Sequence, residues 1–325
     1  MNARTRRPLD VPGLVEQACA GEPRAVARLI SLVEDASPAL REVAAVLASR
    51  SEGKARVIGL TGAPGVGKST STAALVSAYR QRGLRVGVLA VDPSSPFSGG
   101  ALLGDRVRMQ DHATDREVFI RSMATRGHLG GLAWAAPQAL RILDAAGCDV
   151  VLVETVGVGQ AEVEVASMAD STVVLVAPGM GDAIQAAKAG ILEIADVFVV
   201  NKADRDGAQA AIRDLRYMLS LAEKRSGDVW KPPIVATVAS RGEGVEDLVA
   251  ALERHGDWLR RTGELVRRRR ARAAEEVEAI AVTALRERIG DLRGGTALDT
   301  LVGAVMSGEL DPYAAADRLV AGLTG

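Results

Sequence analysis

Two patterns of apolar residues alternate through the middle of the chain. Short apolar runs bounded by turn residues, typical of buried strands, are separated by stretches whose apolar residues recur every three or four positions, as on one face of a helix. This alternation predicts an α/β fold with a mostly parallel sheet flanked by helices. The expected strands are Val57–Leu60, Val86–Val91, Val118–Ile120, Val150–Val153, Thr172–Val176, Val197–Val200 and Ile234–Val238.

Both ends of the chain show the helical pattern alone. Apolar residues recur at helical spacing over residues 14–50, and again along an amphipathic helix from Val277 to Ile289 within a tail that is expected to be helical from Gly263. Two shorter helical segments, Leu298–Met306 and Tyr313–Leu323, follow. We therefore expect three parts, namely an N-terminal helical extension over residues 1–55, an α/β domain over residues 56–260 and a C-terminal helical arm over residues 261–325.

The composition is that of a large folded protein. Of the 325 residues, 48% are hydrophobic and 25% are charged, which suffices for a large buried core. The formal net charge of −1 argues against a general nucleic-acid binder. No uncharged apolar run reaches about 18 residues, so we expect no membrane span. Cys19 and Cys148 belong to no metal-binding motif, which favours a reducing, cytoplasmic location.

Some conspicuous side chains have a structural interpretation. The basic run Arg267–Arg272 is offset by glutamates within residues 275–278, and we expect it to be a solvated helix face rather than a nucleic-acid contact. The three histidines are scattered along the sequence, so a histidine-based metal site is not expected. Trp134, Trp230 and Trp258 are expected to be packing residues or surface anchors.

A glycine-rich segment follows the first expected strand and precedes a helical stretch. Its residues are Gly62-Ala63-Pro64-Gly65-Val66-Gly67-Lys68-Ser69, which fit the pattern G-x-x-x-x-G-K-[ST]. In such a loop the backbone N–H groups point at a phosphate, the lysine reaches the β- and γ-phosphate oxygens, and the serine hydroxyl binds Mg²⁺. We expect the segment from Gly62 to Thr70 to bind nucleotide phosphates, aided by the dipole of the helix that begins near Lys68.

A second motif lies at the end of the expected strand Val197–Val200. It reads Asn201-Lys202-Ala203-Asp204, which fits N-K-x-D and suits guanine. The Asp204 carboxylate can accept hydrogen bonds from guanine N1–H and the 2-amino group, which adenine does not offer. We expect Asn201 to bridge O6 and the loop, and the Lys202 stem to lie over the ring. Ser240, after another apolar run, is expected in a second loop beside the base.

Acidic residues near the ends of strands are candidates for a magnesium site. Glu154 ends the expected strand at residues 150–153, Asp92 ends the strand at residues 86–91, and Asp105 lies in a glycine-rich segment. Carboxylates at such positions orient Mg²⁺ and its waters in phosphate-loop enzymes, although strand-end acids also cap helices. The Gly157 backbone N–H is placed to contact a γ-phosphate and so to sense hydrolysis.

The chain resembles the MeaB/ArgK family of GTPases, relatives of the human methylmalonic aciduria type A protein. The resemblance covers most of residues 14–290, and the run that begins at Glu154 is specific, because small GTPases carry Asp at that position. The matching stretches are Val91–Gly100, Leu103–Arg106, Gly130–Leu132, Val153–Gln160 and Asn201–Asp204.

The resemblance implies a function beyond nucleotide hydrolysis. Similar proteins bind adenosylcobalamin-dependent acyl-CoA mutases, chiefly methylmalonyl-CoA mutase, and use GTP to gate cofactor loading and to protect or reactivate the mutase. The implied cofactor is Mg²⁺ with GTP or GDP, whereas adenosylcobalamin belongs to the partner enzyme. The C-terminal helices are implied to form a homodimer, and neither nucleic acid nor membrane is expected as a partner.

The resemblance also implies roles for single residues. Ser69, Asp92, Asp105 and Glu154 are expected around Mg²⁺. The segment from Pro178 through Asp182 to Lys188 is expected to be a further switch that faces the partner. No residue clearly takes the place of the glutamine that orients the attacking water in small GTPases. Gln160 is a candidate for this role, but its offset from Gly157 differs, so hydrolysis is expected to depend on the partner. The expected catalytic residues are Lys68, Glu154, Asp182 and Lys188.

Two other functional classes are compatible with a phosphate loop. A metallochaperone GTPase would share the loop and the strand-end acids, but usually carries histidine or cysteine ligands, which are sparse here. A small-molecule kinase or transport ATPase would need an acceptor pocket with a general base and would prefer ATP, against which the motif ending at Asp204 argues. Nucleotide selectivity discriminates between these classes.

Overall fold

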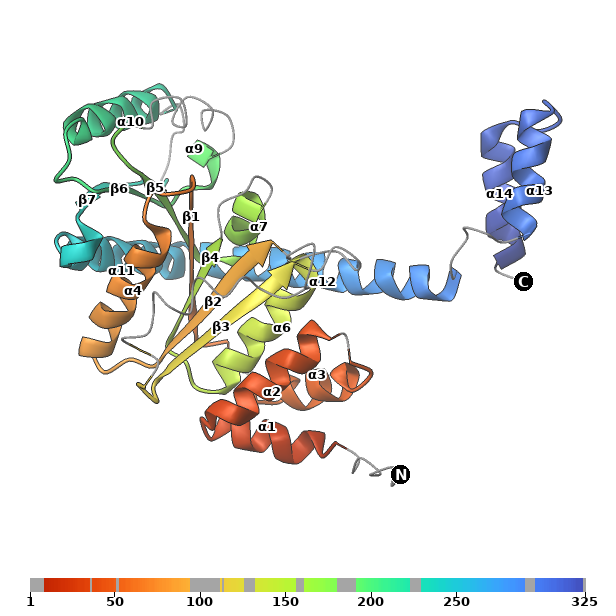
Figure 1. Cartoon of the computed structure of the whole chain (residues 1–325), viewed down its shortest axis with the longest axis horizontal. Helices are drawn as coiled ribbons and strands as arrows, with labels where there is room; N and C mark the ends of the chain where they lie inside the picture. Colours follow the sequence, from red (N-terminus) through yellow and green to blue (C-terminus); the bar gives the residue numbers. More distant parts are fainter. Residues whose placement is uncertain are drawn as a thin grey trace, which may run out of the picture. The chain divides into compact units, whose positions relative to one another are not determined.

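The computed structural model describes residues 9–35, 37–50, 53–93, 112, 114–125, 132–155, 161–179, 191–222, 229–289 and 296–323. Its centre is a seven-stranded sheet of order β3-β2-β4-β1-β5-β6-β7, in which all neighbouring strands are parallel (Figure 1). The predicted fold class and all seven predicted strands are confirmed. The strands are β1 (Arg56–Gly62), β2 (Val86–Pro93), β3 (Val118–Thr125), β4 (Val150–Thr155), β5 (Ser171–Val176), β6 (Val197–Asn201) and β7 (Ile234–Thr237).

The helices lie at both ends of the chain and between the strands. They are α1 (Val11–Cys19), α2 (Pro23–Glu34), α3 (Leu40–Ala48), α4 (Lys68–Gln81), α6 (Leu132–Ala145), α7 (Ala161–Met168), α9 (Ile191–Ile194), α10 (Ala208–Ala222), α11 (Val245–Thr262), α12 (Glu264–Ile289), α13 (Thr296–Met306) and α14 (Pro312–Leu323), with a 3₁₀ turn η2 (Ala239–Arg241). Local chemistry accounts for several helix starts. The Asp10 carboxylate, for example, accepts a hydrogen bond from the Gly13 N–H at 3.0 Å and caps α1.

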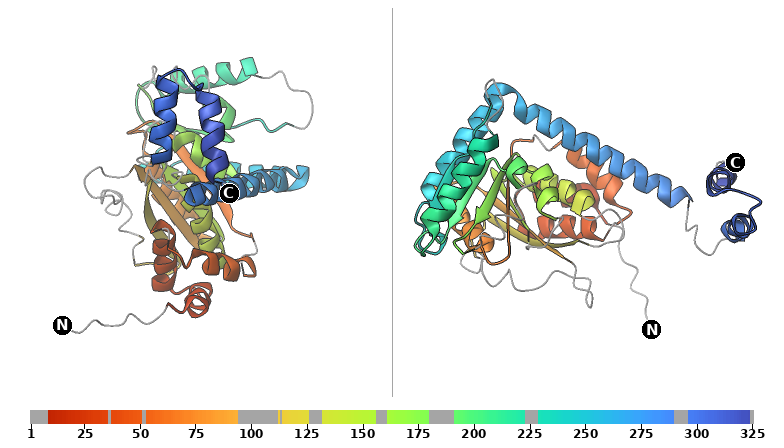
Figure 2. Two further views of the ribbon diagram at one scale, coloured as in Figure 1. Left: turned by 90° about the vertical axis from the view of Figure 1, so that its right-hand side faces the viewer. Right: turned by 90° about the horizontal axis from the view of Figure 1, so that it is seen from above.

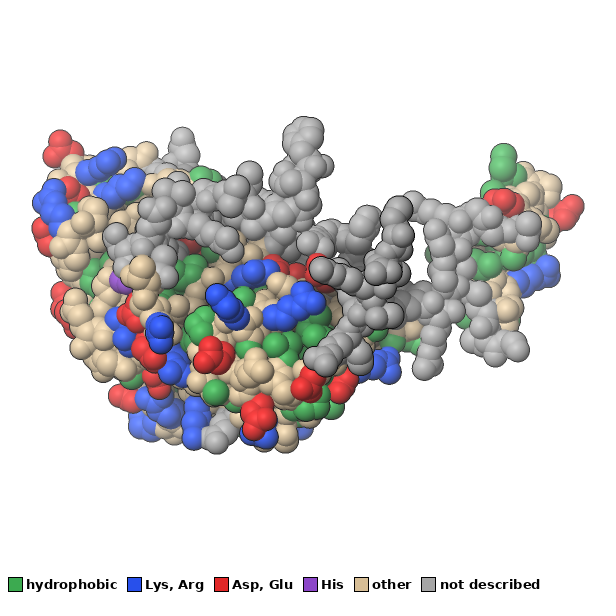
Figure 3. Space-filling view, turned by 60° about the horizontal axis from the view of Figure 1, so that its bottom comes forward, with side chains coloured by type: hydrophobic (Ala, Val, Ile, Leu, Met, Phe, Trp, Pro, Cys, Tyr) green, Lys and Arg blue, Asp and Glu red, His purple; other side chains and the backbone are tan. Residues whose placement is uncertain are grey.

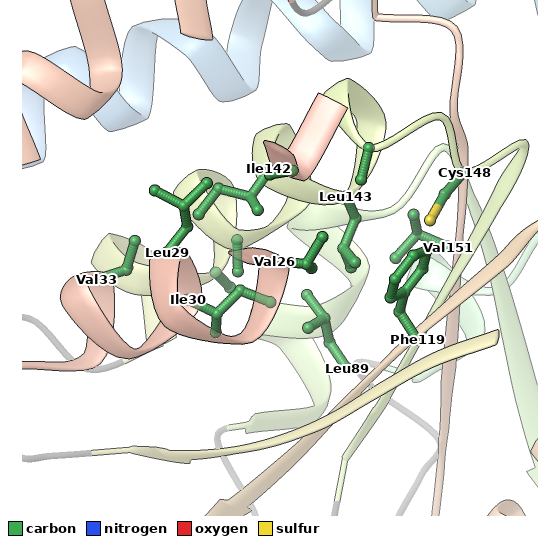
Figure 4. Packing of buried hydrophobic residues seen from close by; sticks show 14 of the residues in the cluster. Val26, Leu29, Ile30, Val33, Leu89, Phe119, Ile142, Leu143, Cys148 and Val151 are labelled. Carbon is green, nitrogen blue, oxygen red and sulfur yellow. The ribbon is translucent and has the colours of Figure 1, made fainter. Parts of the chain in front are cut away.

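Helices cover both faces of the sheet (Figures 1 and 2). On one face α4 and α11 bury their apolar sides against β1 and its neighbours. On the other face the N-terminal helices pack on α6 and the sheet, and Figure 4 shows Leu29 and Ile30 of α2 in one cluster with Ile142 of α6 and Leu89 of β2. These buried side chains are at most 1% exposed, so the N-terminal helices share the core of the sheet.

The chain divides into two compact units, Met1–Ala274 and Glu275–Gly325. The first unit contains the sheet, its helices and the beginning of α12. The second contains the rest of α12 and the pair α13 and α14, joined by a turn in which Gly308 has φ +77°. The three-part division of the sequence stays a prediction. No described helix is long and apolar enough to cross a membrane.

Basic and acidic side chains are interspersed on the surface of the first unit that Figure 3 shows. Ion pairs also form among the described residues, as between Arg80 and Asp115 at 2.8 Å and between Arg85 and Glu117 at 2.7 Å. The guanidinium of Arg80 lowers the pKa of Asp115, and that of Arg85 lowers the pKa of Glu117. Exposed pairs of this kind add little stability, but the mixed pattern agrees with the formal net charge of −1.

The prediction that Arg267–Arg272 is a solvated face is wrong for three of its arginines. Arg268 binds the Asp196 carboxylate through two hydrogen bonds of 2.9 Å, and Arg269 and Arg272 bind Asp170 at 2.7 and 2.5 Å. The Asp170 and Asp196 side chains are only 2% and 6% exposed. Because these acids lie far away in sequence, immediately before β5 and β6, the charge pattern along α12 could not indicate them.

Breaking this network tests its contribution to stability. Removing the charge of Asp170 leaves two guanidinium groups without their carboxylate. We expect Asp170→Asn to lower the free energy of unfolding by about 2–3 kcal/mol at pH 7, less than for a fully buried pair, because the Arg269 and Arg272 side chains are 30% and 20% exposed. Urea denaturation of both proteins measures this difference, and Arg270→Gln, on the exposed side of the same helix, is the control.

The same comparison has a defined pH dependence. Burial alone would raise the pKa of Asp170, but Arg269 and Arg272 outweigh it and hold the pKa below its ordinary value. A carboxyl with a lowered folded-state pKa stabilises at pH above its unfolded value of about 3.9, and this contribution is lost as the pH falls through the folded value. The stability difference should therefore be constant from about pH 6 to 8 and shrink below about pH 4. A difference that persists unchanged in acid would contradict the assignment.

Candidate functional site

The phosphate-loop sequence forms a tight turn between β1 and α4. Gly62 ends β1 with φ +141°, and a Cβ there would lie 2.3 Å from the Leu175 carbonyl oxygen of β5. Gly67 has φ +97° immediately before α4, and its Cβ would lie 2.4 Å from the Asn201 amide nitrogen. Both positions therefore require glycine for space as well as for conformation. The sharp turn leads directly into the N-terminus of α4, where anions bind favourably.

Lys68 lies over this loop. Its Nζ donates hydrogen bonds to the carbonyl oxygens of Gly62 at 2.6 Å and Ala63 at 3.2 Å, and the residue is 8% exposed. The ammonium group thus lies at the mouth of the turn, where the phosphates of a nucleotide would lie. A bound polyphosphate would offer it stronger, charged acceptors than these carbonyls.

The first turns of α4 face the end of β4. Glu154 is 1% exposed, and its neighbours in the sheet are Leu60 of β1 and Ala90 of β2. Its carboxylate accepts a hydrogen bond from the Thr72 hydroxyl, one helical turn after Lys68. The sequence analysis did not identify Thr72, although its spacing of four from Lys68 places it on the same helix face.

The described side chains fit Mg²⁺. Ser69 opens the first turn of α4, and the buried Glu154 carboxylate lies against the next turn, so the two offer a hydroxyl and a carboxylate oxygen. Mg²⁺ prefers such oxygen ligands and keeps several waters beside substrate phosphates. The backbone of Asp92 lies near the end of β2, the strand beside β4, but its side chain is not described. Asp105, Gly157, Gln160, Asp182 and Lys188 lie outside the described residues.

Asn201 joins three loops at the end of β6. Its Nδ2 donates to the Val66 carbonyl in the phosphate loop at 2.8 Å. Its Oδ1 accepts from the Thr237 hydroxyl and from the Ala239 N–H, each at 3.1 Å. The side chain is therefore engaged within the protein, and it links the phosphate loop to β7 and η2. Its predicted contact with O6 of the base stays a prediction.

The next two motif residues also have protein partners. Lys202 is in the left-handed region with φ +57°, and its Nζ donates to the Gly65 carbonyl at 2.6 Å. The Asp204 carboxylate pairs with Arg241 at 2.8 Å. Ser240 lies in η2 and is exposed, and its neighbours Ala239 and Arg241 contact Asn201 and Asp204 of the motif. Ala239 belongs to the loop that the sequence placed beside the base, whereas nothing in this short run marks Arg241.

A Ser–His–Asp group lies at the starts of β5 and β6, the ends of these strands opposite to the nucleotide loops. Ser171 Oγ is 2.8 Å from His255 Nδ1, and His255 Nε2 is 3.2 Å from Asp196 Oδ1. The rings of Trp230 and Trp258 pack on His255 with centroid distances of 4.7 and 5.7 Å, so the prediction that these tryptophans are packing residues is confirmed.

This group is structural. Ser171 and His255 are 0% exposed, so no substrate can reach the serine oxygen as in a serine hydrolase. Burial would raise the pKa of Asp196, but His255 and Arg268 lower it below its ordinary value, which keeps the carboxylate charged. Asp196 thus connects the start of β6 to α11 through His255 and to α12 through Arg268, and Trp230 Nε1 donates to its carbonyl oxygen at 2.7 Å. The Trp134 side chain is not described.

The parallel sheet, the lysine-bearing glycine loop after β1 and the N-K-x-D motif at the end of β6, two strands away, define a phosphate-loop GTPase. The chain belongs to the MeaB family, because the model of the methylmalonyl-CoA mutase-associated GTPase MeaB matches residues 26–292. The family resemblance seen in the sequence is thereby confirmed, and the protein is a GTP-hydrolysing enzyme.

Relatives span nearly the whole chain. A protein of Pyrococcus horikoshii is 46% identical over 96% of this chain and 98% of its own length. The GTPase ArgK of Escherichia coli K12 is 38% identical over 78% of both chains, and the mouse mitochondrial methylmalonic aciduria type A homologue is 38% identical over 77% of this chain and 64% of its own. A crystal structure described as a LAO/AO transport system kinase aligns with TM-score 0.71 and 27% identity, covering 100% of this chain and 99% of that one.

Lys68 offers a direct test of the phosphate site. Removing its ammonium group should weaken GTP binding by about 10- to 100-fold, the effect of losing a hydrogen bond to a charged group. Isothermal titration of Lys68→Ala with GTP measures the loss. Lys231→Ala, which removes an exposed lysine elsewhere, is the control and should bind like the unmodified protein. Equal affinity of the Lys68 variant would refute the phosphate-loop assignment.

Proposed function

We propose that this GTPase is a chaperone for an adenosylcobalamin-dependent acyl-CoA mutase, with methylmalonyl-CoA mutase as the first candidate. In this proposal it gates cofactor loading and protects or reactivates the mutase. The observation that carries the proposal is the match over residues 26–292 to a family whose description names association with that mutase. The mouse relative, named for methylmalonic aciduria type A, adds support.

The nucleotide would bind across the loops at the carboxyl ends of β1 and β6. The segment from Gly62 to Thr70 would hold the phosphates, and Asn201, Lys202, Asp204 and Ser240 would surround the guanine. Support comes from the side-chain tethers that already join these loops, Asn201 to Val66 and Lys202 to Gly65. A site held together before binding loses less entropy when the ligand arrives.

Magnesium would be held by Ser69 and Glu154, with Asp92 and Asp105 acting partly through water. When bound it would draw charge from the β- and γ-phosphate oxygens, and Lys68 would do the same from the protein side. Glu154, Asp182 and Lys188 would contribute to catalysis. Loss of the γ-phosphate would relax the segments around Asp105, Gly157 and Asp182 and change the surface offered to the mutase.

The C-terminal unit would form a homodimer. Large apolar side chains are exposed along it, and single ones such as Met306 and Tyr313 are each 84% exposed. Contiguous apolar surface is typical of a protein interface. The others in this unit are Val277, Ile280, Val282, Leu285, Val302 and Val320.

Cys19 and Cys148 are both free thiols, which supports the proposed cytoplasmic location.

GTP and ATP turnover, with and without a methylmalonyl-CoA mutase from the same source, tests the proposed function. We expect slow GTP-selective hydrolysis that rises several-fold when the mutase is added, because the partner completes the catalytic site. GTP-selective hydrolysis whose rate does not change when the mutase is added would refute methylmalonyl-CoA mutase as the client. Preference for ATP would overturn the guanine assignment and favour the kinase alternative.

The Asp204→Asn variant tests guanine recognition independently of the mutase. Asp204→Asn replaces one acceptor oxygen by a donor, which mismatches the N1–H and 2-amino donors of guanine and suits xanthine. We expect GTP affinity to fall by about 10- to 100-fold and XTP affinity to rise. Competition of GTP, XTP and ATP against a fluorescent guanine nucleotide measures both changes. An unaltered GTP/ATP ratio would contradict the role assigned to Asp204.

A further inference from the structure

The loop after β7 is closed by its own backbone and fixes the position of Arg241. The Arg241 N–H donates to the Val238 carbonyl at 2.8 Å, and the Val238 N–H donates to the Glu243 carbonyl at 3.0 Å. Gly242 takes φ +74°, which lets the chain reverse immediately after η2. Arg241 therefore projects from an ordered turn rather than from a long loop.

Its guanidinium group lies between two carboxylates. Arg241 Nη2 is 2.8 Å from Asp204 Oδ2, and Nη1 is 3.6 Å from Glu243 Oε1. The Arg241 side chain is 59% exposed and that of Asp204 is 35% exposed. Among the described residues, Arg241 is the side chain seen to hold the carboxylate of Asp204.

The three motif residues are thus held in different ways. Asn201 is held by the Val66 carbonyl of the phosphate loop and by Thr237 and Ala239, and Lys202 is held by the Gly65 carbonyl. In the described part of the chain, the Asp204 carboxylate is bound by Arg241 of the loop after β7 and not by the phosphate loop. The orientation of its carboxylate therefore depends on Arg241.

We infer that Arg241 is a positioning residue that determines guanine specificity through Asp204. A carboxylate has about four lone-pair sites, and Arg241 uses one, which leaves acceptors for both N1–H and the 2-amino group of guanine. Holding the carboxylate in one orientation reduces the entropy lost when the base binds. This inference rests on the proposed guanine site at Asp204.

The chemistry predicts which nucleotides respond. GTP presents two donors to Asp204, whereas ITP lacks the 2-amino group and presents one. Disordering the carboxylate therefore costs GTP more than ITP. Because the pair is partly exposed, we expect Arg241→Ala to reduce the ratio of ITP to GTP dissociation constants about two- to fivefold, together with a similar loss of GTP affinity.

The test is a competition titration of GTP, ITP and ATP on the full chain. Arg205→Ala is the matched control, since it removes an exposed arginine one residue after Asp204 whose side chain forms no ion pair with Asp204 in the described structure. Arg241→Lys keeps the charge but loses the planar fork, and should recover part of the discrimination. Raising the ionic strength should bring the ITP/GTP ratio of dissociation constants of the unmodified protein closer to that of Arg241→Ala, because salt screens the Arg241–Asp204 pair.

Each outcome decides the inference. A fall in the ITP/GTP ratio for Arg241→Ala but not for Arg205→Ala supports it. An unchanged ratio overturns it, and tighter GTP binding would overturn it in the opposite sense by showing that Arg241 competes with the base. The double variant with Asp204→Asn should lose no more discrimination than Asp204→Asn alone.

Failure of the guanine site itself has a separate signature. If Asp204→Asn leaves the ITP/GTP ratio unaltered, the base is not read by this residue and the proposed site is wrong. If Asp204→Asn changes the ratio while Arg241→Ala does not, only the role of Arg241 fails. The melting temperature of each variant checks that all of them are folded.

Discussion

The arrangement of the nucleotide loops depends on one side chain, the amide of Asn201. It donates to the Val66 carbonyl and accepts from Thr237 and Ala239, so it ties the phosphate loop to β7 and the turn after it. The approach is so close that the facing residue, Gly67, has no room for a Cβ. A buried amide with these partners has one favourable arrangement, because leaving any of them unpaired would cost about 1–3 kcal/mol.

The two ends of β6 have different functions. At the carboxyl end of β6, Asn201 and Lys202 bind the phosphate loop. Immediately before the same strand, Asp196 forms an ion pair with Arg268 and lies 3.2 Å from His255 Nε2, and it braces the start of β6 against α11 and α12. A strand anchored at one end by buried ion pairs can present its other end as a rigid platform, which suits the positioning of a ligand.

The sequence predicted much of the fold and less of the site. All seven strands were recognisable because buried strands in a parallel sheet are apolar on both faces, and the phosphate loop because its residue order is itself the mechanism. The arginines of α12 were misjudged, since their partners Asp170 and Asp196 lie far away in the chain. Arg241 and Thr72 were missed for the same reason, because each matters through a residue on another element.

The sequence by itself determined the class of chemistry. The lysine after a glycine loop and the N-K-x-D tetrapeptide are defined by residues within a few positions of one another. Such local patterns can be recognised from the sequence alone. Only the tertiary structure decided which charges are buried and which side chains hold Asn201, Lys202 and Asp204 in place. Hydrogen bonds and ion pairs act over about 3 Å, and the chain brings their partners together only when the sheet has formed.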